Sequence, residues 1–129
     1  MTIERVRDTK RAGERWDEIF EALSAEPRRQ LIATLSNAPA GRRVLLPDAA
    51  TSSIESVDRD ELRLQLMHRH LPVLSEFGFV DWTTDPFCAQ RGMRFGEVAT
   101  VFDALCSHAD DVPDHLLAGS ERFESTRVE

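Results

Sequence analysis

The stretch LRLQLMHRHLPVLSEFGFVDW, residues 62–82, decides how the rest of the chain is organised. At about 100° per residue, its apolar side chains gather on one broad arc of a helical wheel. This arc holds Leu62, Leu64, Leu66, Met67, Leu71, Val73, Leu74 and Phe77. The opposite arc holds Gln65, His68, Arg69, Pro72, Ser75 and Glu76. The pattern predicts an amphipathic helix over 58–77, with its apolar side in a core and its polar side presented outward.

The two ends of this predicted helix carry local signals. Asp58 is expected to be the N-cap, and Glu61 three residues later would complete a capping box. Gly78 suits the left-handed position that ends a helix. The alternating segment 79–83 then predicts a half-buried strand, the first of a hairpin.

Two residues are unusual inside the predicted helix. Pro72 removes a backbone N–H and should bend the helix, and its place on the polar arc lets water hydrate the freed carbonyl of His68. Arg63 falls on the apolar arc near the start. We expect either that its charged end reaches out to water or that the helix is irregular there.

Two short motifs resemble those of a known family. The pattern HLxxLxxxGFV at 70–80 resembles the recognition helix and first wing strand of ArsR-type winged helix-turn-helix regulators. The form HxHLPxL at 68–74 is closer still to an ArsR-like domain widespread in haloarchaea. A second segment, ALSxxPRRxLI at 22–32, resembles the start of that family's second helix. The resemblance implies a mainly α fold with a small β-hairpin, the winged helix-turn-helix.

The chain divides into three predicted regions: a flexible N-terminal extension over 1–13, a winged helix-turn-helix domain with a C-terminal dimerisation helix over 14–117, and a polar tail over 118–129. Further helices are predicted over 14–23, 26–36 and 97–109. The shorter predicted elements are a brief strand over 42–46, the start of a short third helix over 47–51, the second wing strand over 88–95 and one more helical turn over 112–117. In the family, a compact turn precedes the recognition helix. Here the chain departs from the pattern, because 52–57 is a loose polar connection.

Composition limits the function classes. The chain has 129 residues, of which 41% are hydrophobic, and its longest apolar runs are too short to span a bilayer. Residues 1–13 lack the apolar core of a signal peptide, so we expect a cytoplasmic protein. The net charge is −7, and Lys10 is the only lysine among 16 basic residues. This acidic, lysine-poor composition is typical of a halophilic protein, although a GC-rich genome alone would also favour arginine.

Double-stranded DNA is the predicted partner of the outward helix face. The predicted DNA-binding residues are Gln65, His68 and Arg69 on the helix, Arg91 and Arg94 on the wing, and Arg42 and Arg43 before the third helix. Amide, imidazole and guanidinium groups hydrogen-bond base edges, and arginine also meets phosphate. The alternative is a solvated polar face, since Glu61 and Glu76 share this arc and repel phosphate. Most of the surplus acid lies elsewhere, in 96–129.

A homodimer is expected from the resemblance, because terminal helices form the dimer interface in ArsR-like proteins. The residues that this expectation assigns to the interface are Trp16, Ile19, Phe20, Val98, Val101, Phe102 and Leu105. All of them lie on the apolar stripes of the first and last predicted helices. Such a dimer would place two copies of the reading helix along one face of DNA.

Other site classes receive less support from the sequence. His70 lies inside the apolar arc and is predicted to be a packed, hydrogen-bonded histidine. Neither His68 and His70 nor Cys106 and His108 form a ready chelate, because residues two apart on a helix point about 200° apart. Metal sensing is therefore not predicted, nor is a redox role for Cys88, since nothing near it in sequence lowers a thiol pKa.

Two functions remain open at this stage. The first is a DNA-binding transcriptional regulator that reads DNA with helix 58–77 and wing 79–95, and that uses no cofactor. The second is a winged-helix protein-interaction module without specific DNA binding, because a fold does not fix a function. An enzyme is not predicted, because the chain has no glycine-rich phosphate loop, no GxSxG elbow and no HExxH motif.

Overall fold

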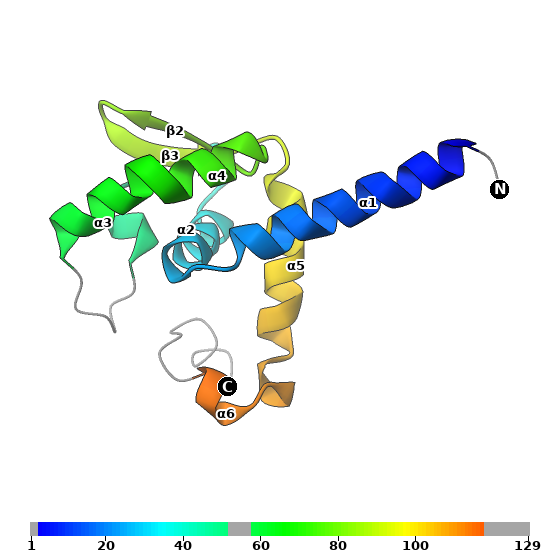
Figure 1. Ribbon diagram of the computed structural model, residues 1–129. Helices are drawn as coiled ribbons and strands as arrows, with labels where there is room; N and C mark the ends of the chain where they lie inside the picture. Colours follow the sequence, from blue (N-terminus) through cyan, green and yellow to red (C-terminus); the bar gives the residue numbers. More distant parts are fainter. Residues whose placement is uncertain (1–2, 52–57, 118–129) are drawn as a thin grey trace.

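The computed structural model describes residues 3–51 and 58–117 (Figure 1). This part of the chain is mainly helical and carries one small three-stranded antiparallel sheet. Its α-helices are α1 (Ile3–Ala22), α2 (Glu26–Asn37), α3 (Arg59–Gln65), α4 (Leu71–Glu76), α5 (Phe95–Ser107) and α6 (Asp114–Leu117). Its strands are β1 (Val44–Leu45), β2 (Val80–Thr84) and β3 (Phe87–Arg91). Shorter turns are the 3-10 helices η1 (Asp48–Ala50) and η3 (Ala109–Asp111), and the π-helical turn η2 (Leu66–His70).

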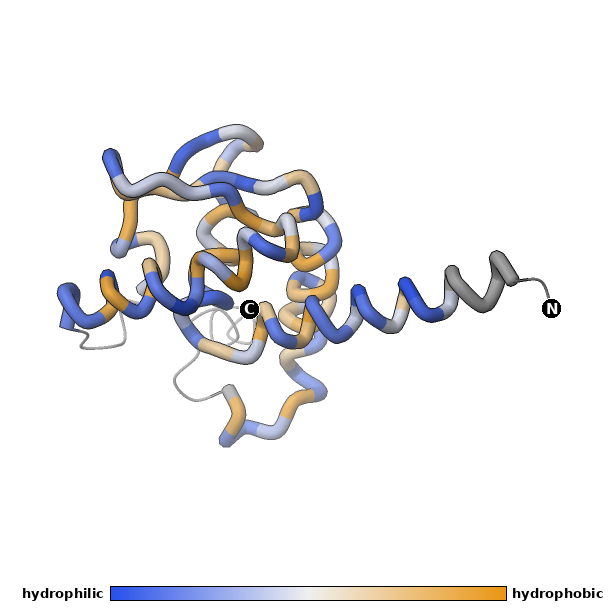
Figure 2. Tube along the Cα trace, turned by 45° about the horizontal axis from the view of Figure 1, so that its top comes forward, coloured by the Kyte–Doolittle hydropathy of each residue, from blue (hydrophilic) through white to orange (hydrophobic). Residues whose placement is uncertain are grey.

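Helix α1 is longer than predicted. It begins at Ile3 rather than at Glu14, so most of the predicted flexible extension is helical. The first half of α1 projects away from the body of the molecule (Figure 1), and its side chains over 9–17 are exposed. Residues 9–17 are mostly hydrophilic (Figure 2). The C-terminal end of α1 enters the core through Ile19 and Ala22.

Helix α2 starts at Glu26, as predicted. Pro27 occupies its first turn, where a missing N–H costs no hydrogen bond. Leu31, Ile32 and Leu35 form an inner face that is fully buried. The helix ends at Asn37, immediately before the segment that the sequence marks as a breaker.

The segment predicted as one helix over 58–77 forms a continuous helical rod, α3–η2–α4 (Figure 1). Asp58 caps it as predicted, because its carboxylate accepts hydrogen bonds from the N–H groups of Asp60 and Glu61 at 3.0 and 3.2 Å. The side chain of Glu61 accepts from Gln65 Nε2 at 3.3 Å. Asp58 therefore caps the first turn. The Glu61 side chain bonds Gln65 on the helix surface instead of completing the predicted capping box.

The sequence predicts a bend at Pro72, and the structure places the π turn η2 just before this residue. The N–H of Leu71 donates to the carbonyl of Leu66, five residues back, which widens the helix by one residue. Pro72 follows directly and has no N–H to give to the His68 carbonyl. The widened turn therefore lets the rod continue past the proline.

The sheet combines the predicted hairpin with the brief strand predicted within 42–46, which forms β1. Strands β2 and β3 pair antiparallel, with Trp82 opposite Ala89, and β1 pairs with the other edge of β3. Gly78 adopts φ +79° and ends the helical rod as predicted. The backbone at Gly92 passes so close to Gly78 that a Cβ added at Gly92 would lie 2.5 Å from the Gly78 carbonyl oxygen. Glycine is therefore required at this crossing.

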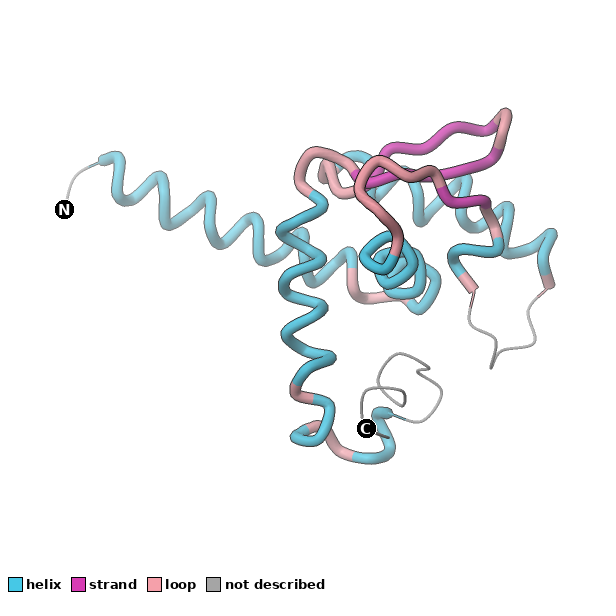
Figure 3. Tube along the Cα trace, turned by 180° about the vertical axis from the view of Figure 1, so that it is seen from behind, coloured by secondary structure: helices cyan, strands magenta, loops and turns pink. Residues whose placement is uncertain are grey.

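One core joins these elements. Its largest fully buried side chains are Leu31, Ile32, Leu35, Leu66, Leu71, Leu74, Phe79, Val80 and Val98. Helix α4 packs on β2, while α1 and α2 both contact α5. Seen from behind, the three strands lie at one edge of the molecule and α5 runs away from them toward α6 (Figure 3). Across the described ranges, no helix has the length and apolar character needed to cross a bilayer.

Candidate nucleic-acid interface

The polar face of the α3–η2–α4 rod is open to solvent. Gln65, His68 and Arg69 are all exposed, as predicted. On the opposite side, Leu66 and Leu71 are completely buried. The rod is therefore fixed from behind by the core, which leaves these three polar side chains presented together on a rigid element.

Two side chains at the start of the rod do not lie where the helical wheel places them. Leu64 was placed on the apolar arc, but 58% of it is exposed. Arg63 was placed there too, and its guanidinium lies over the ring of Phe87, 4.5 Å from the centroid. Arg63 thus covers apolar surface of the β2–β3 hairpin while its charged end remains in water, which is one of the two predicted arrangements.

His70 is packed and hydrogen-bonded, as predicted. It is 2% exposed, and Arg28 Nη1 lies 2.9 Å from its Nδ1. A guanidinium only donates, so Nδ1 must be the acceptor and the ring is neutral with its proton on Nε2. Burial, together with the nearby charges of Arg28 and Arg69, lowers the pKa of His70 to about 4. His70 is therefore held in one tautomer and one protonation state.

Arg28 is the other half of this buried pair, and it is 4% exposed. Its remaining donors reach the end of α1: Nε donates to the Ala22 carbonyl at 3.2 Å, and Nη2 to the Glu21 carbonyl at 3.0 Å. Nη2 also donates to Ser24 Oγ at 2.6 Å. Burial, followed by the charge of Arg69, lowers the pKa of Arg28. The carbonyls at a helix C-terminus carry partial negative charge and stabilise the buried cation.

Arg91 is bound by the protein itself, contrary to its predicted role as a phosphate contact. Its guanidinium donates to the Leu35 carbonyl at 2.9 and 3.1 Å, to Ser36 at 3.3 Å and to Ala38 at 2.7 Å. It also lies over the ring of Phe95. Arg91 therefore caps the C-terminus of α2, where the last carbonyls of the helix have no partner within it.

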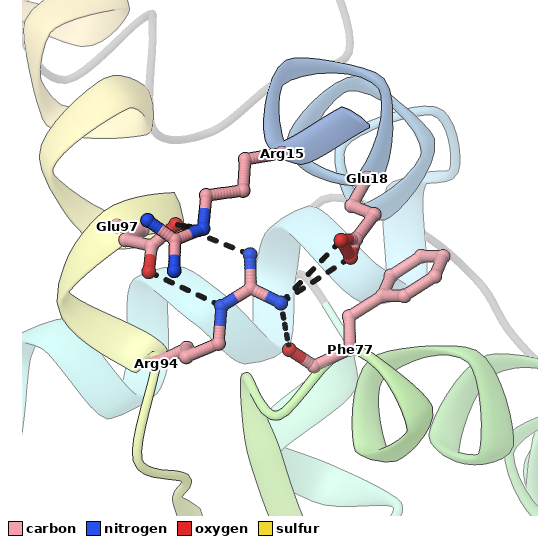
Figure 4. Close-up of polar contacts among 5 residues, drawn as sticks. All are labelled: Arg15, Glu18, Phe77, Arg94 and Glu97. Atoms are coloured by element: carbon pink, nitrogen blue, oxygen red, sulfur yellow. Dashed lines mark hydrogen bonds and ion pairs between the residues drawn. The ribbon is translucent and has the colours of Figure 1, made fainter. Parts of the chain in front are cut away.

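Arg94 is likewise engaged within the fold (Figure 4). It donates to the Phe77 carbonyl at 2.9 Å and to the carboxylates of Glu18 and Glu97 at 3.1–3.4 Å. Hydrogen bonding to Glu97, and then to Glu18, raises the pKa of Arg94. Arg15 approaches the same Glu97 carboxylate at 3.9 Å. Arg94 joins α1, the end of α4 and the start of α5, so the prediction that it meets DNA is replaced by this role.

Arg42 and Arg43, the last two predicted contacts, remain available. Both are exposed, and among the described residues neither side chain forms a hydrogen bond or an ion pair. Exposed acidic side chains also lie on the rod and on the β2–β3 hairpin: Glu61, Glu76, Asp81 and Asp85. The local charge is therefore mixed, and the described hairpin offers no basic group free to contact phosphate.

The predicted dimer residues separate into two groups. Ile19, Val98 and Phe102 are buried inside the protomer, so the prediction that they contact a second copy is wrong. They lie on the sides of α1 and α5 that pack into the core. The rest are exposed or half-buried: Trp16, Phe20, Val101 and Leu105.

An open groove runs between α1 and α5. It has a volume of about 730 Å³, with Trp16 and Val101 among its apolar lining and Arg11, Arg15 and Glu97 among its polar lining. The Trp16 ring stacks on Phe20 with centroids 5.8 Å apart. Two large aromatic rings are thus held together on the solvent side of α1.

The two cysteines are buried and do not form a disulfide with each other. Cys88 is 3% exposed and Cys106 is 2% exposed. Cys88 Sγ lies 3.4 Å from Thr83 Oγ1 on the neighbouring strand. Within the described part of the chain, no three histidine, cysteine or acidic side chains gather as possible metal ligands. The segment 52–57, predicted as a loose connection, lies outside the described residues.

Arg28 was absent from the predicted site residues, although its spacing contained a signal. Arg28 stands three and four residues before Leu31 and Ile32, which places it on the buried face of α2. A charged residue on such a face needs buried hydrogen-bond partners. Glu18 carried no comparable signal, because its partner Arg94 lies far along the chain.

Comparisons with known proteins add no relative. No protein-family model matches the chain, and no curated protein or solved structure matches it. The relation to ArsR-like regulators therefore stays a prediction from the two sequence motifs.

Proposed function

We propose that the chain is a DNA-binding transcriptional regulator with a winged helix-turn-helix fold. The α3–η2–α4 rod is the recognition helix and the β2–β3 hairpin is the wing. One observation carries the proposal: Gln65, His68 and Arg69 are exposed together on a helix whose opposite face is fixed in the core. A base-reading helix needs this combination of open hydrogen-bonding groups and a rigid support.

The side-chain chemistry suits the major groove. Glutamine pairs with adenine through two hydrogen bonds, and arginine pairs with guanine in the same way. The groove is about 12 Å wide, which admits one α-helix. Gln65 and Arg69 are four residues apart, on either side of the start of the π turn. The pair would read neighbouring base pairs, and His68 would contact a base or a phosphate beside them.

Phosphate contacts in this proposal come from fewer arginines than the sequence predicts. Arg91 and Arg94 are held by the fold, which leaves Arg42 and Arg43 for the backbone of the duplex. With a net charge of −7, general attraction to DNA is weak. Affinity would therefore depend on a few specific contacts.

The proposed regulator is a homodimer. Trp16 and Phe20 present stacked aromatic surface on the solvent side of α1, and Leu105 is exposed on α5. Exposed aromatic clusters are typical of protein interfaces. Two copies joined through these helices would bring two recognition helices to one duplex, as a palindromic operator requires.

The rival function is a protein-interaction module, and specific observations favour it. Both wing arginines are occupied inside the fold, and the hairpin exposes Asp81 and Asp85 instead. A surface of this charge repels phosphate and suits a basic protein partner. Binding to DNA decides between the two functions.

Selection of duplexes from a random library by the full chain, at high potassium chloride, is the direct test. We expect a defined sequence motif, and an affinity for the selected duplex that exceeds the affinity for mixed-sequence DNA by about 1,000-fold or more. Arg69→Ala should lower the specific affinity by about 10-fold or more. Arg29→Ala is the control, because the Arg29 side chain donates to the Leu23 carbonyl and Glu26, away from the exposed face of the rod.

The salt dependence identifies the kind of contact that Arg69 makes. If Arg69 meets phosphate, the slope of log affinity against log salt becomes shallower by about 0.9 in Arg69→Ala. If Arg69 reads a base, the slope stays the same and the preferred base at one position is lost. Failure to enrich any motif, with no retention of genomic DNA, would reject the regulator and leave the interaction module.

A further inference from the structure

The buried pair of Arg28 and His70 connects parts of the molecule that are otherwise separate. His70 is the last residue of the π turn η2, within the rod that presents Gln65, His68 and Arg69. Arg28 comes from the first turn of α2, 42 residues earlier in the chain. One guanidinium thus contacts the rod on one side and the end of α1 on the other.

The geometry of Arg28 is tightly determined by its partners. Among the described residues, its side-chain hydrogen bonds go to His70 Nδ1, two backbone carbonyls and Ser24 Oγ, and none of these acceptors is a carboxylate. A buried cation is expensive unless its donors are satisfied, and a planar guanidinium satisfies them only in a fixed orientation. Arg28 Nη1 and His70 Nδ1 are 2.9 Å apart, so a small movement of the His70 ring away from Arg28 breaks this hydrogen bond.

The contact falls at the irregular, π-helical part of the rod. In a π turn the backbone bonds span five residues, and this hydrogen-bonding pattern is rare and local. Pro72 removes the next donor, so the carbonyl of His68 receives no bond from that position. The side chain of His70 thus fixes from inside a turn whose outside carries His68 and Arg69.

We infer that Arg28 is a positioning residue for DNA reading: acting through His70, it holds the π turn in the shape that presents His68 and Arg69 to the bases. The inference rests on the proposed function. It adds a residue that is 4% exposed and so does not touch DNA itself. It also makes the end of α1, where Arg28 binds the Glu21 and Ala22 carbonyls, part of the same unit as the recognition helix.

The test measures the ratio of affinities for the selected duplex and for mixed-sequence DNA. Misplacing base-reading side chains lowers this ratio, whereas partial loss of folded protein lowers both affinities equally. Arg28→Met removes all donors at similar length, and His70→Leu removes the acceptor. His70→Gln keeps an acceptor facing Arg28. Arg29→Met is the matched control, because Arg29 bonds the same α1–α2 junction through the Leu23 carbonyl and Glu26.

We expect Arg28→Met and His70→Leu each to lower the ratio by about 10-fold, the size of a lost base contact. His70→Gln should stay within about 3-fold of the natural protein, and Arg29→Met within about 2-fold. Hydrogen exchange of the Leu71 amide, which closes the π turn on Leu66, should accelerate in Arg28→Met and remain unchanged in Arg29→Met.

Each result decides one statement. If the natural protein shows no preference for any duplex, the proposed regulator fails and the positioning role fails with it. If the natural protein prefers its selected duplex and both Arg28→Met and His70→Leu keep the ratio, only the positioning role is overturned. An equal loss of the affinity ratio in Arg29→Met would also overturn the positioning role. If Arg28→Met does not fold, His70→Leu and the rescue by His70→Gln decide the question.

Discussion

Acid should destabilise this fold through His70. The neutral ring accepts a hydrogen bond from Arg28 at 2.9 Å, and a protonated ring would instead place an N–H against the guanidinium donors. The site is 2% exposed, so water cannot separate the two charges. The free energy of unfolding must therefore fall as the pH drops into the range where the unfolded chain protonates this histidine.

The size of the effect follows from the two pKa values of His70, which are 6.5 ordinarily and about 4 in the folded protein. Because the folded state binds the proton less tightly, the stability is complete above the ordinary pKa and is lost as the pH falls toward the folded one. Linkage gives a loss of about 2 kcal/mol between pH 7.5 and pH 5, and about 3 kcal/mol below pH 4.

Urea unfolding, followed by tryptophan fluorescence at constant salt and protein concentration, measures this loss. His70→Gln keeps an acceptor for Arg28 but does not titrate, so we expect its stability to change by less than about 0.5 kcal/mol over the same interval. His68→Gln removes an exposed histidine from the same turn and should keep the natural pH dependence. The pKa of Glu97 is lowered by Arg94, so its contribution is lost only below this interval.

Two results would refute the reasoning. Equal pH dependence in the natural protein and in His70→Gln would show that His70 is not the titrating group. A natural protein whose stability is flat between pH 7.5 and pH 5 would show that its ring is not confined beside a cation. In either case the hydrogen bond to Arg28 would have to be weaker than its geometry indicates.

Two further predictions concern other parts of the molecule. Arg94→Met should lower the free energy of unfolding by about 2 kcal/mol, since it removes the donor to the part-buried Phe77 carbonyl and the ion pairs with Glu18 and Glu97. Arg42→Met, at an exposed position, should change it by less than about 0.5 kcal/mol. Urea unfolding checks both, and equal losses would contradict the role given to Arg94. Phe20→Glu should yield a monomer in high-salt light scattering, while Leu116→Glu, at another exposed apolar position, should leave the dimer intact. A natural protein of monomeric mass would remove the proposed dimer.

The arginines of this acidic chain fall into two groups with different roles. The arginines nearest the core stabilise helix ends and junctions: Arg28 at the end of α1, Arg91 at the end of α2 and Arg94 at the end of α4. These bonds satisfy carbonyls that a helix leaves open. Arg69, by contrast, stays exposed on the rod. Arginine therefore has two separate tasks here, and only the exposed ones are available for a partner.

The sequence alone determined the features that depend on neighbouring residues. The start of α2 at Glu26, the cap at Asp58, the stop at Gly78 and the outward direction of Gln65, His68 and Arg69 all follow from helical spacing and from local backbone preferences. The burial of His70 followed from its place on the apolar arc. These features act over a few residues, so a single segment contains the information.

Only the tertiary structure decided which arginines are free. Arg91 and Arg94 had the same exposed, basic character in the sequence as Arg42 and Arg43. Their partners Leu35 and Glu18 lie 56 and 76 residues away, and no local pattern identifies them. The tertiary structure also decided which sides of α1 and α5 face the core. Ile19, Val98 and Phe102 lie on those sides and are buried. The physical reason is that burial and hydrogen-bond satisfaction depend on what packs alongside, and packing partners are fixed only once the chain has folded.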